Sequence, residues 1–82
     1  MTPEQIEKYI EKEERKGTPL SIHFKDRQSV TGTFVETADY DELKLKNLWR
    51  VVTPANINDW NKTKNQNLNR IFNGASFTRL SD

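Results

Sequence analysis

Apolar residues recur with a helical spacing near the start of the chain. These residues are Ile6, Tyr9 and Ile10, whose spacing of three and four positions places them in one stripe along a helix. A helix start precedes it, because Thr2 can cap a helix, Pro3 suits the first helical position and Gln5 completes a capping box. Charged residues dominate from there to Gly17. We therefore predict a helix over residues 2–17 that packs its first turns against a sheet.

Beyond residue 19 the apolar positions change to a period of two, which is typical of half-buried strands. The first alternating run contains Leu20, Ile22 and Phe24, and the second contains Val30, Gly32 and Phe34. Gly32 inside a strand predicts strong bending of the sheet. Leu43 and Leu45 alternate with lysines, and residues 48–52 extend or follow that run. The segment 20–52 thus predicts three strands.

The last third of the chain divides into a polar stretch and a short apolar tail. Residues 53–69 contain six asparagines and predict a loop, which we expect Ile57 and Trp60 to fasten to the sheet. Residues 70–80 predict a hairpin that reverses at Gly74, where the lack of a Cβ permits a positive φ. One helix followed by about five short strands, without βαβ alternation, predicts a single domain over 1–82, mostly β, built as a small antiparallel barrel or sheet.

Length and composition suggest how such a domain is stabilised. A chain of 82 residues with 33% hydrophobic residues has a small core, and it has no cysteine for disulfides or thiolate metal sites. Association with further copies is the expected reinforcement. The segment 43–80 carries seven basic residues and one acidic residue, a net charge of 7 − 1 = +6, which favours contact with phosphates.

Sequence signals for other classes of protein are weak. No Ser/His/Asp set, phosphate loop or dinucleotide fingerprint is evident, and His23 stands alone on a predicted strand. We therefore expect no enzymatic activity, no cofactor and no metal. Without an apolar run of signal-peptide or membrane-span type, we expect a cytoplasmic protein with no membrane partner.

Two segments resemble the signatures of the Sm-like proteins, the superfamily that includes the bacterial host factor (Hfq). The first comprises Ile22-x-Phe24, Val30-x-Gly32-x-Phe34, Asp39 and Leu43-x-Leu45. The second is Phe72-Asn73-Gly74-x-x-Phe77-x-x-Leu80. The resemblance implies a strongly bent, five-stranded, antiparallel SH3-like barrel capped by the N-terminal helix. It also implies a homo-oligomeric ring of roughly five to seven copies, joined by pairing of the fourth strand of one copy with the fifth strand of the next.

Site residues follow from the same resemblance. The implied edges are residues 69–73 and 75–80, and the implied subunit interface contains Asn69, Ile71, Phe72, Phe77 and Leu80. Family members bind single-stranded RNA through the turn after the second strand and the turn in the last hairpin. The corresponding RNA-binding candidates are Asp39, Tyr40, Asn73, Gly74, Lys44, Lys46 and Arg70. Tyr40 could stack on a base, and Asn73 offers donor and acceptor groups to a base edge.

Alternatives stay open at this point. Leu45-Lys46-Asn47 also resembles the host-factor branch, and that alignment places the last two strands near residues 49–60 instead of 69–80. The family's usual arginine before the second-signature glycine is Asn73 here, and Asp41 and Glu42 add negative charge to the first turn. The chain is thus either an RNA-binding ring with a chaperone or scaffolding role or a structural, protein-interaction ring that does not bind RNA. A general binder of single-stranded DNA is a third reading.

Overall fold

The computed structural model describes residues 1–12 and 17–82. Its helices and strands, in chain order, are α1 (Pro3–Glu11), β1 (Pro19–Phe24), β2 (Val30–Phe34), α2 (Tyr40–Leu45), β3 (Leu48–Val52), α3 (Ile57–Thr63), β4 (Asn69–Asn73) and β5 (Phe77–Ser81). Short 3₁₀ turns connect the later elements, namely η2 (Pro54–Asn56), η3 (Gln66–Leu68) and η4 (Gly74–Ser76). None of the helices in the described part of the chain has the length and apolar character needed to cross a membrane.

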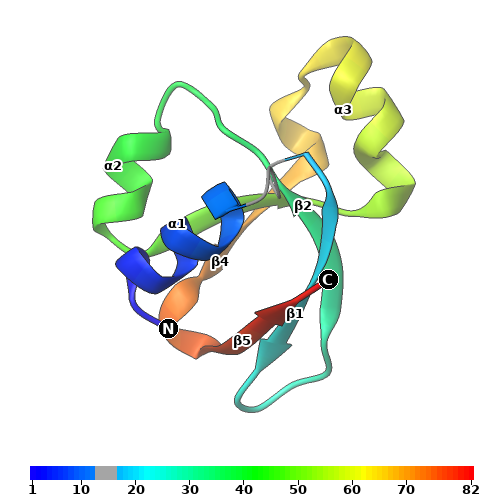
Figure 1. Cartoon of the computed structure of the whole chain (residues 1–82). Helices are drawn as coiled ribbons and strands as arrows, with labels where there is room; N and C mark the ends of the chain where they lie inside the picture. The colour runs from blue at the N-terminus through cyan, green and yellow to red at the C-terminus, as the bar shows by residue number, and fades with distance from the viewer. Residues whose placement is uncertain (13–16) are drawn as a thin grey trace.

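The strands form one antiparallel sheet in the order β4-β3-β2-β1-β5, so β4 and β5 are its two open edges (Figure 1). This arrangement corrects the predicted hairpin over residues 70–80. β4 pairs with β3 over its whole length, whereas β5 pairs with β1. The turn η4 carries the chain from one edge of the sheet to the other. The two edge strands lie where the resemblance places them, but they are not partners of each other.

The core lies between α1 and the concave face of the sheet. Its buried residues are Ile6, Ile10, Leu20, Ile22, Phe34, Trp49, Val51, Phe77 and Leu80. The ring centroids of Phe24 on β1 and Phe72 on β4 lie 5.7 Å apart, although two strands separate β1 from β4 in the sheet. The sheet therefore curls. Gly32 allows close approach within it, since a Cβ there would lie 2.3 Å from Cγ1 of Val51.

The start of α1 confirms the predicted capping box. The Thr2 N–H donates to Oε1 of Gln5 at 2.9 Å, and the Gln5 N–H donates to Oγ1 of Thr2 at 3.2 Å. The helix is shorter than predicted, because Lys12 has extended backbone angles and ends it. The predicted continuation over residues 13–16 lies outside the described residues. Of the described glycines, only Gly17 has a positive φ.

The segment predicted as the beginning of the third strand is instead helix α2, and β3 begins at Leu48. Asp41 and Glu42 occupy the first helical turn and Lys44 the last, which suits the helix dipole. Two ion pairs with helical spacing also form, Asp41 with Lys44 at 3.8 Å and Glu42 with Lys46 at 3.9 Å. Leu45 consequently points outward and is 84% exposed.

The predicted loop over residues 53–69 contains η2, α3 and η3. Ile57 and Trp60 stand three residues apart on α3, where Trp60 is buried and Ile57 is half-buried. Their role in fastening this segment to the sheet stays a prediction. Lys64 then ends the helix in a left-handed conformation. Because residues 54–63 are helical, the alignment that places the last two strands near 49–60 is wrong. Those strands lie at 69–73 and 77–81.

Candidate functional site

One of the two turns that the resemblance assigns to RNA, at Asn73 and Gly74, lies against Asn47, just beyond helix α2. The other assigned turn, residues 39–42, lies at the start of that helix. The Gly74 N–H donates to the backbone oxygen of Asn47 at 2.8 Å. Gly74 is buried, and a Cβ at this position would lie 2.2 Å from Oδ1 of Asn47 and 2.5 Å from Cδ1 of Ile6. The reason for glycine here is therefore space, not the positive φ that the predicted hairpin required.

Asn47 joins these turns to the rest of the fold, and sequence reasoning did not single it out. Its backbone is left-handed, with φ of 59°. Its Oδ1 accepts a hydrogen bond from Nε1 of Trp49 at 2.8 Å, and its Nδ2 donates to the backbone oxygen of Met1 at 2.9 Å. An asparagine directly before a strand is a recognisable signal, since asparagine tolerates left-handed angles better than most residues. Its contacts with Met1 and Gly74 have no local signature.

Tyr40 packs inside this arrangement. Its ring meets the ring of Trp49 edge-on, with centroids 6.1 Å apart and planes at 74°. The ammonium group of Lys44 lies 5.5 Å from the Tyr40 ring centroid. Stacking on a base needs an exposed aromatic face, and Tyr40 is half-buried with a cation already above its ring. The contacts of Tyr40 are mainly internal.

Asp39 also serves the fold, through an ion pair with Arg50 on β3. Nη2 and Nε of Arg50 donate to the two carboxylate oxygens of Asp39 at 2.8 and 3.2 Å, and the Thr37 hydroxyl donates to the same carboxylate. The hydrogen bonds from Arg50 and Thr37 lower the pKa of Asp39 to about 2. Nη1 of Arg50 donates to Oδ1 of Asn69 at 2.8 Å, so the network reaches the edge strand β4. The charge of Asp39 is therefore compensated within the chain.

The remaining RNA-binding candidates differ in how available they are. Lys44 donates to the carboxylate of Glu7 on α1, a hydrogen bond that raises the pKa of Lys44. The side chain of Lys46 is 63% exposed, and Arg70 is exposed on β4. Asn73 is exposed as well; its Oδ1 accepts from the Ala75 N–H at 2.9 Å and caps η4. A ligand can thus reach three groups, which are the side-chain NH₂ of Asn73 and the cationic side chains of Lys46 and Arg70.

The predicted interface residues lie on the two edge strands with contrasting exposure. Phe77 and Leu80 are buried in the core of their own chain, Asn69 is buried in the Arg50 network, and Phe72 packs against Phe24. Ile71 is 46% exposed, a large apolar side chain on an open edge. At the other four predicted interface positions, mainly backbone groups are available to a partner.

His23 ties β1 to β5 instead of standing alone. Its Nε2 lies 3.0 Å from Oγ of Ser81, and its Nδ1 lies 2.9 Å from Oγ of Ser29.

No family model matches this chain, and neither a curated protein nor a solved structure shows significant similarity to it. The proposals that follow therefore depend on the geometry of the described residues and on the resemblance of the two signatures.

Proposed function

We propose that the protein is an Sm-like, strongly bent SH3-like barrel whose copies join into a homo-oligomeric ring and bind single-stranded RNA. The observation that carries the ring is the strand order. β4 and β5 are each five residues long, and within the described part of the chain each has one side without a partner strand. Unpaired edges recruit further strands, and a contact between different edges repeats from copy to copy until it closes.

The chemistry of β4 supports this assembly. Ile71 places a large apolar side chain in solvent on the edge strand, and pairing with a second copy would remove it from water. A domain of this size has little core stability of its own and gains from association. The ring expected from the resemblance has roughly five to seven copies.

Two features support RNA as the ligand. The second turn of the resemblance packs against Asn47 through the N–H of Gly74, and the amide of Asn73 is exposed beside this contact. The exposed cations Lys46 and Arg70 belong to the segment 43–80, which carries a net positive charge. We assign base contact to Asn73 and phosphate contact to the two cations.

A second candidate, a ring that serves structure or protein interaction without RNA, is favoured by a specific observation. Asp39, Tyr40 and Lys44, three of the residues expected to form the RNA site, are engaged by Arg50, Trp49 and Glu7. In this version the first turn stabilises the domain, and the edges alone carry the function.

Light scattering on the purified protein tests the ring. We expect a mass several times that of the 9.6 kDa chain. Ile71→Lys, which places a charge on the β4 edge, should reduce the mass to that of one copy. Leu45→Lys makes the same change at an exposed apolar residue on α2, away from both edges, and should leave the mass unchanged. A monomeric wild-type protein at micromolar concentration rules out the ring.

Binding of fluorescent oligo-U and oligo-A distinguishes the two candidates. If the protein binds RNA, we expect micromolar affinity at low salt and an affinity that declines as salt rises. Asn73→Ala should bind more weakly than the control Asn61→Ala on α3. Absence of binding at low salt would leave the ring without RNA as the better account. Equal affinity for oligo-dT would favour the general reading as a binder of single strands.

A further inference from the structure

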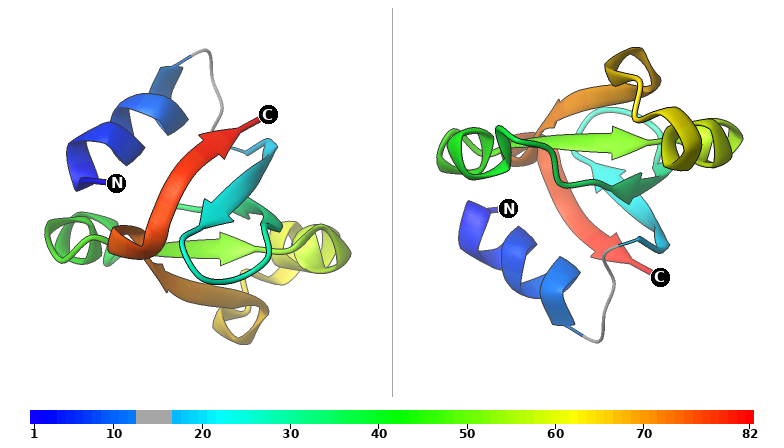
Figure 2. Two further views of the ribbon diagram at one scale, coloured as in Figure 1. Left: turned by 90° about the horizontal axis from the view of Figure 1, so that it is seen from below. Right: turned by 90° about the horizontal axis from the view of Figure 1, so that it is seen from above.

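A groove of about 540 Å³ runs between α1 and the edge strand β5. Figure 2 shows the helix and the strand side by side along this edge of the molecule. The helix contributes Gln5, Lys8, Tyr9 and Lys12, the strand contributes Thr78, Arg79 and Leu80, and Met1 closes one end. Met1 also contacts the turn at Gly74, because its ammonium group donates to the Gly74 oxygen at 3.0 Å, whereas the other lining residues belong to α1 and β5.

Three basic side chains line the groove, Lys8 and Lys12 from the helix and Arg79 from the strand. Within residues 1–12 and 17–82, none of the three forms an ion pair, and no acidic side chain is among the described residues of the lining. Asp82 stands beside the groove and accepts a hydrogen bond from the Tyr9 hydroxyl at 3.2 Å. The excess of positive charge selects an anionic occupant.

The floor of the groove is a strand edge, which selects an extended peptide among anions. β5 pairs with β1 on one side. On its other side no strand of the described residues pairs with it, and the Met1 ammonium donates to the backbone oxygen of Phe77 at 2.9 Å. The register shift between His23 and Phe24 leaves Thr78 without a partner residue in the ladder, so the regular part of the edge is short. Such an edge accepts a few residues of added strand, and side chains on alternate positions then meet the flanking cations.

We propose that the groove between α1 and β5 binds a short acidic peptide segment, which adds to β5 and places its carboxylates against Lys8, Lys12 and Arg79. The chain's own β4 fits this position less well, because it carries Arg70 and no acidic residue. Nucleic acid is less suited as well, since Tyr9, the aromatic residue of the lining, is half-buried and hydrogen-bonded through its hydroxyl.

This site goes beyond the proposed ring and competes with it, because a peptide on β5 occupies the edge that the next copy would use. The two proposals are separable. Ile71→Lys blocks the β4 edge and leaves β5 intact, so binding to the groove can be measured on this variant whether or not the wild-type protein forms a ring.

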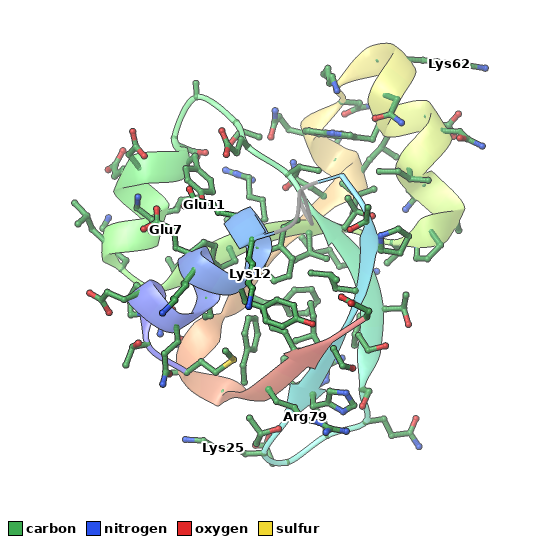
Figure 3. The ribbon with its side chains drawn as sticks, viewed as in Figure 1. Glu7, Glu11, Lys12, Lys25, Lys62 and Arg79 are labelled. Carbon is green, nitrogen blue, oxygen red and sulfur yellow. The ribbon has the colours of Figure 1, made fainter. Side chains whose placement is uncertain are left out.

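The test is fluorescence anisotropy with a labelled peptide of alternating glutamate and valine, on Ile71→Lys protein at low ionic strength. We expect saturable binding that weakens as salt rises, and about tenfold weaker binding when Lys12→Glu and Arg79→Glu are combined. The matched control combines Lys25→Glu with Lys62→Glu. These exposed lysines do not line the groove, and Figure 3 shows Lys62 on α3 at the far end of the molecule.

Amide hydrogen exchange provides the structural measurement. Peptide binding should slow exchange on β5 and leave β4 unchanged. Equal binding of an alternating lysine and valine peptide, or an equal loss in both charge-reversed proteins, would overturn the proposal. The proposal would also be overturned if oligo-U bound with an affinity that depends on Lys12 and Arg79 while the acidic peptide did not bind. The groove would then serve RNA.

Discussion

Helix α1 has two sides with different electrostatic character. On the side of α2, Glu7 pairs with Lys44, and the neighbouring Asn47 links Met1, Trp49 and Gly74. On the side of β5, Lys8 and Lys12 face Arg79 across a groove, and the described residues offer them no carboxylate partner. Charges of both signs meet on the first side, and charges of one sign gather on the second.

This difference separates charge that the fold uses from charge that it leaves for a partner. Paired groups on the α2 side hold elements together that are distant in sequence, so changes there should affect stability. Exposed surface cations contribute little to stability, and the cost of holding like charges together is recovered when an anion arrives. Substitutions that disrupt the first side should therefore weaken the fold.

The largest effect is expected from Gly74→Ala. The added Cβ would overlap Oδ1 of Asn47, which is held by Trp49, and Cδ1 of Ile6. Overpacking of this kind costs about 1–3 kcal/mol, a large share of the ~3–5 kcal/mol that a small core provides. Urea denaturation should show the midpoint shifted well below that of the wild type.

The control for this variant is Ala75→Gly, one residue along in η4, where the side chain is exposed. We expect a much smaller shift for this change. If Gly74→Ala were as stable as the wild type, the close packing of η4 against Asn47 and α1 would be refuted.

An effect of intermediate size is expected from Asp39→Asn, on how the free energy of unfolding depends on pH in acid. The pKa of Asp39 is lowered in the folded protein, from 3.8 to about 2, so the folded state binds a proton less readily than the unfolded state. The stabilisation is present above pH 3.8 and is lost as the pH falls toward about 2. The unfolding free energy of Asp39→Asn should therefore depend less on pH in this window than that of the wild type.

Asp41→Asn is the matched control, because Asp41 lies two residues after Asp39, in the first turn of α2, with its side chain 92% exposed. Its curve of stability against pH should follow the wild type. Coincident curves for the two variants would show that the ion pair of Asp39 with Arg50 does not contribute to the acid response.

The sequence predicts those elements whose apolar period is long enough to exclude alternatives. The start of α1 and the alternating runs of β1 and β2 are of this kind, and most of their buried residues lie where the pattern places them, although Thr33 of the polar face of β2 is buried as well. Leu43-Lys44-Leu45-Lys46 is too short to distinguish a strand from a helix. Ion pairs at helical spacing and the pairing of Lys44 with Glu7 decide for the helix.

Contacts between distant parts of the chain account for what the sequence did not predict. The tail suggests a local hairpin, yet Asn73 pairs with Leu48 while Leu80 pairs with Ile22. The role of Asn47 likewise depends on Met1 and Gly74, at opposite ends of the chain. Of the candidate site, residue types were predictable, but not that Asp39 and Lys44 would be engaged by Arg50 and Glu7.

The smallest effect concerns the reactivity of Lys44 and shows whether its pairing persists in solution. The hydrogen bond to Glu7 raises the pKa of Lys44, which reduces the fraction of unprotonated amine that an acylating reagent can attack. Glu7→Gln removes the negative charge and should make acetylation of Lys44 faster by a small factor, measured by peptide mass spectrometry at neutral pH. Lys46 is the internal control, because its partner is Glu42, and its rate should not change. An unchanged rate at Lys44 would mean that Glu7 does not hold this amine. The two sides of α1 would then differ less in solution than their geometry indicates.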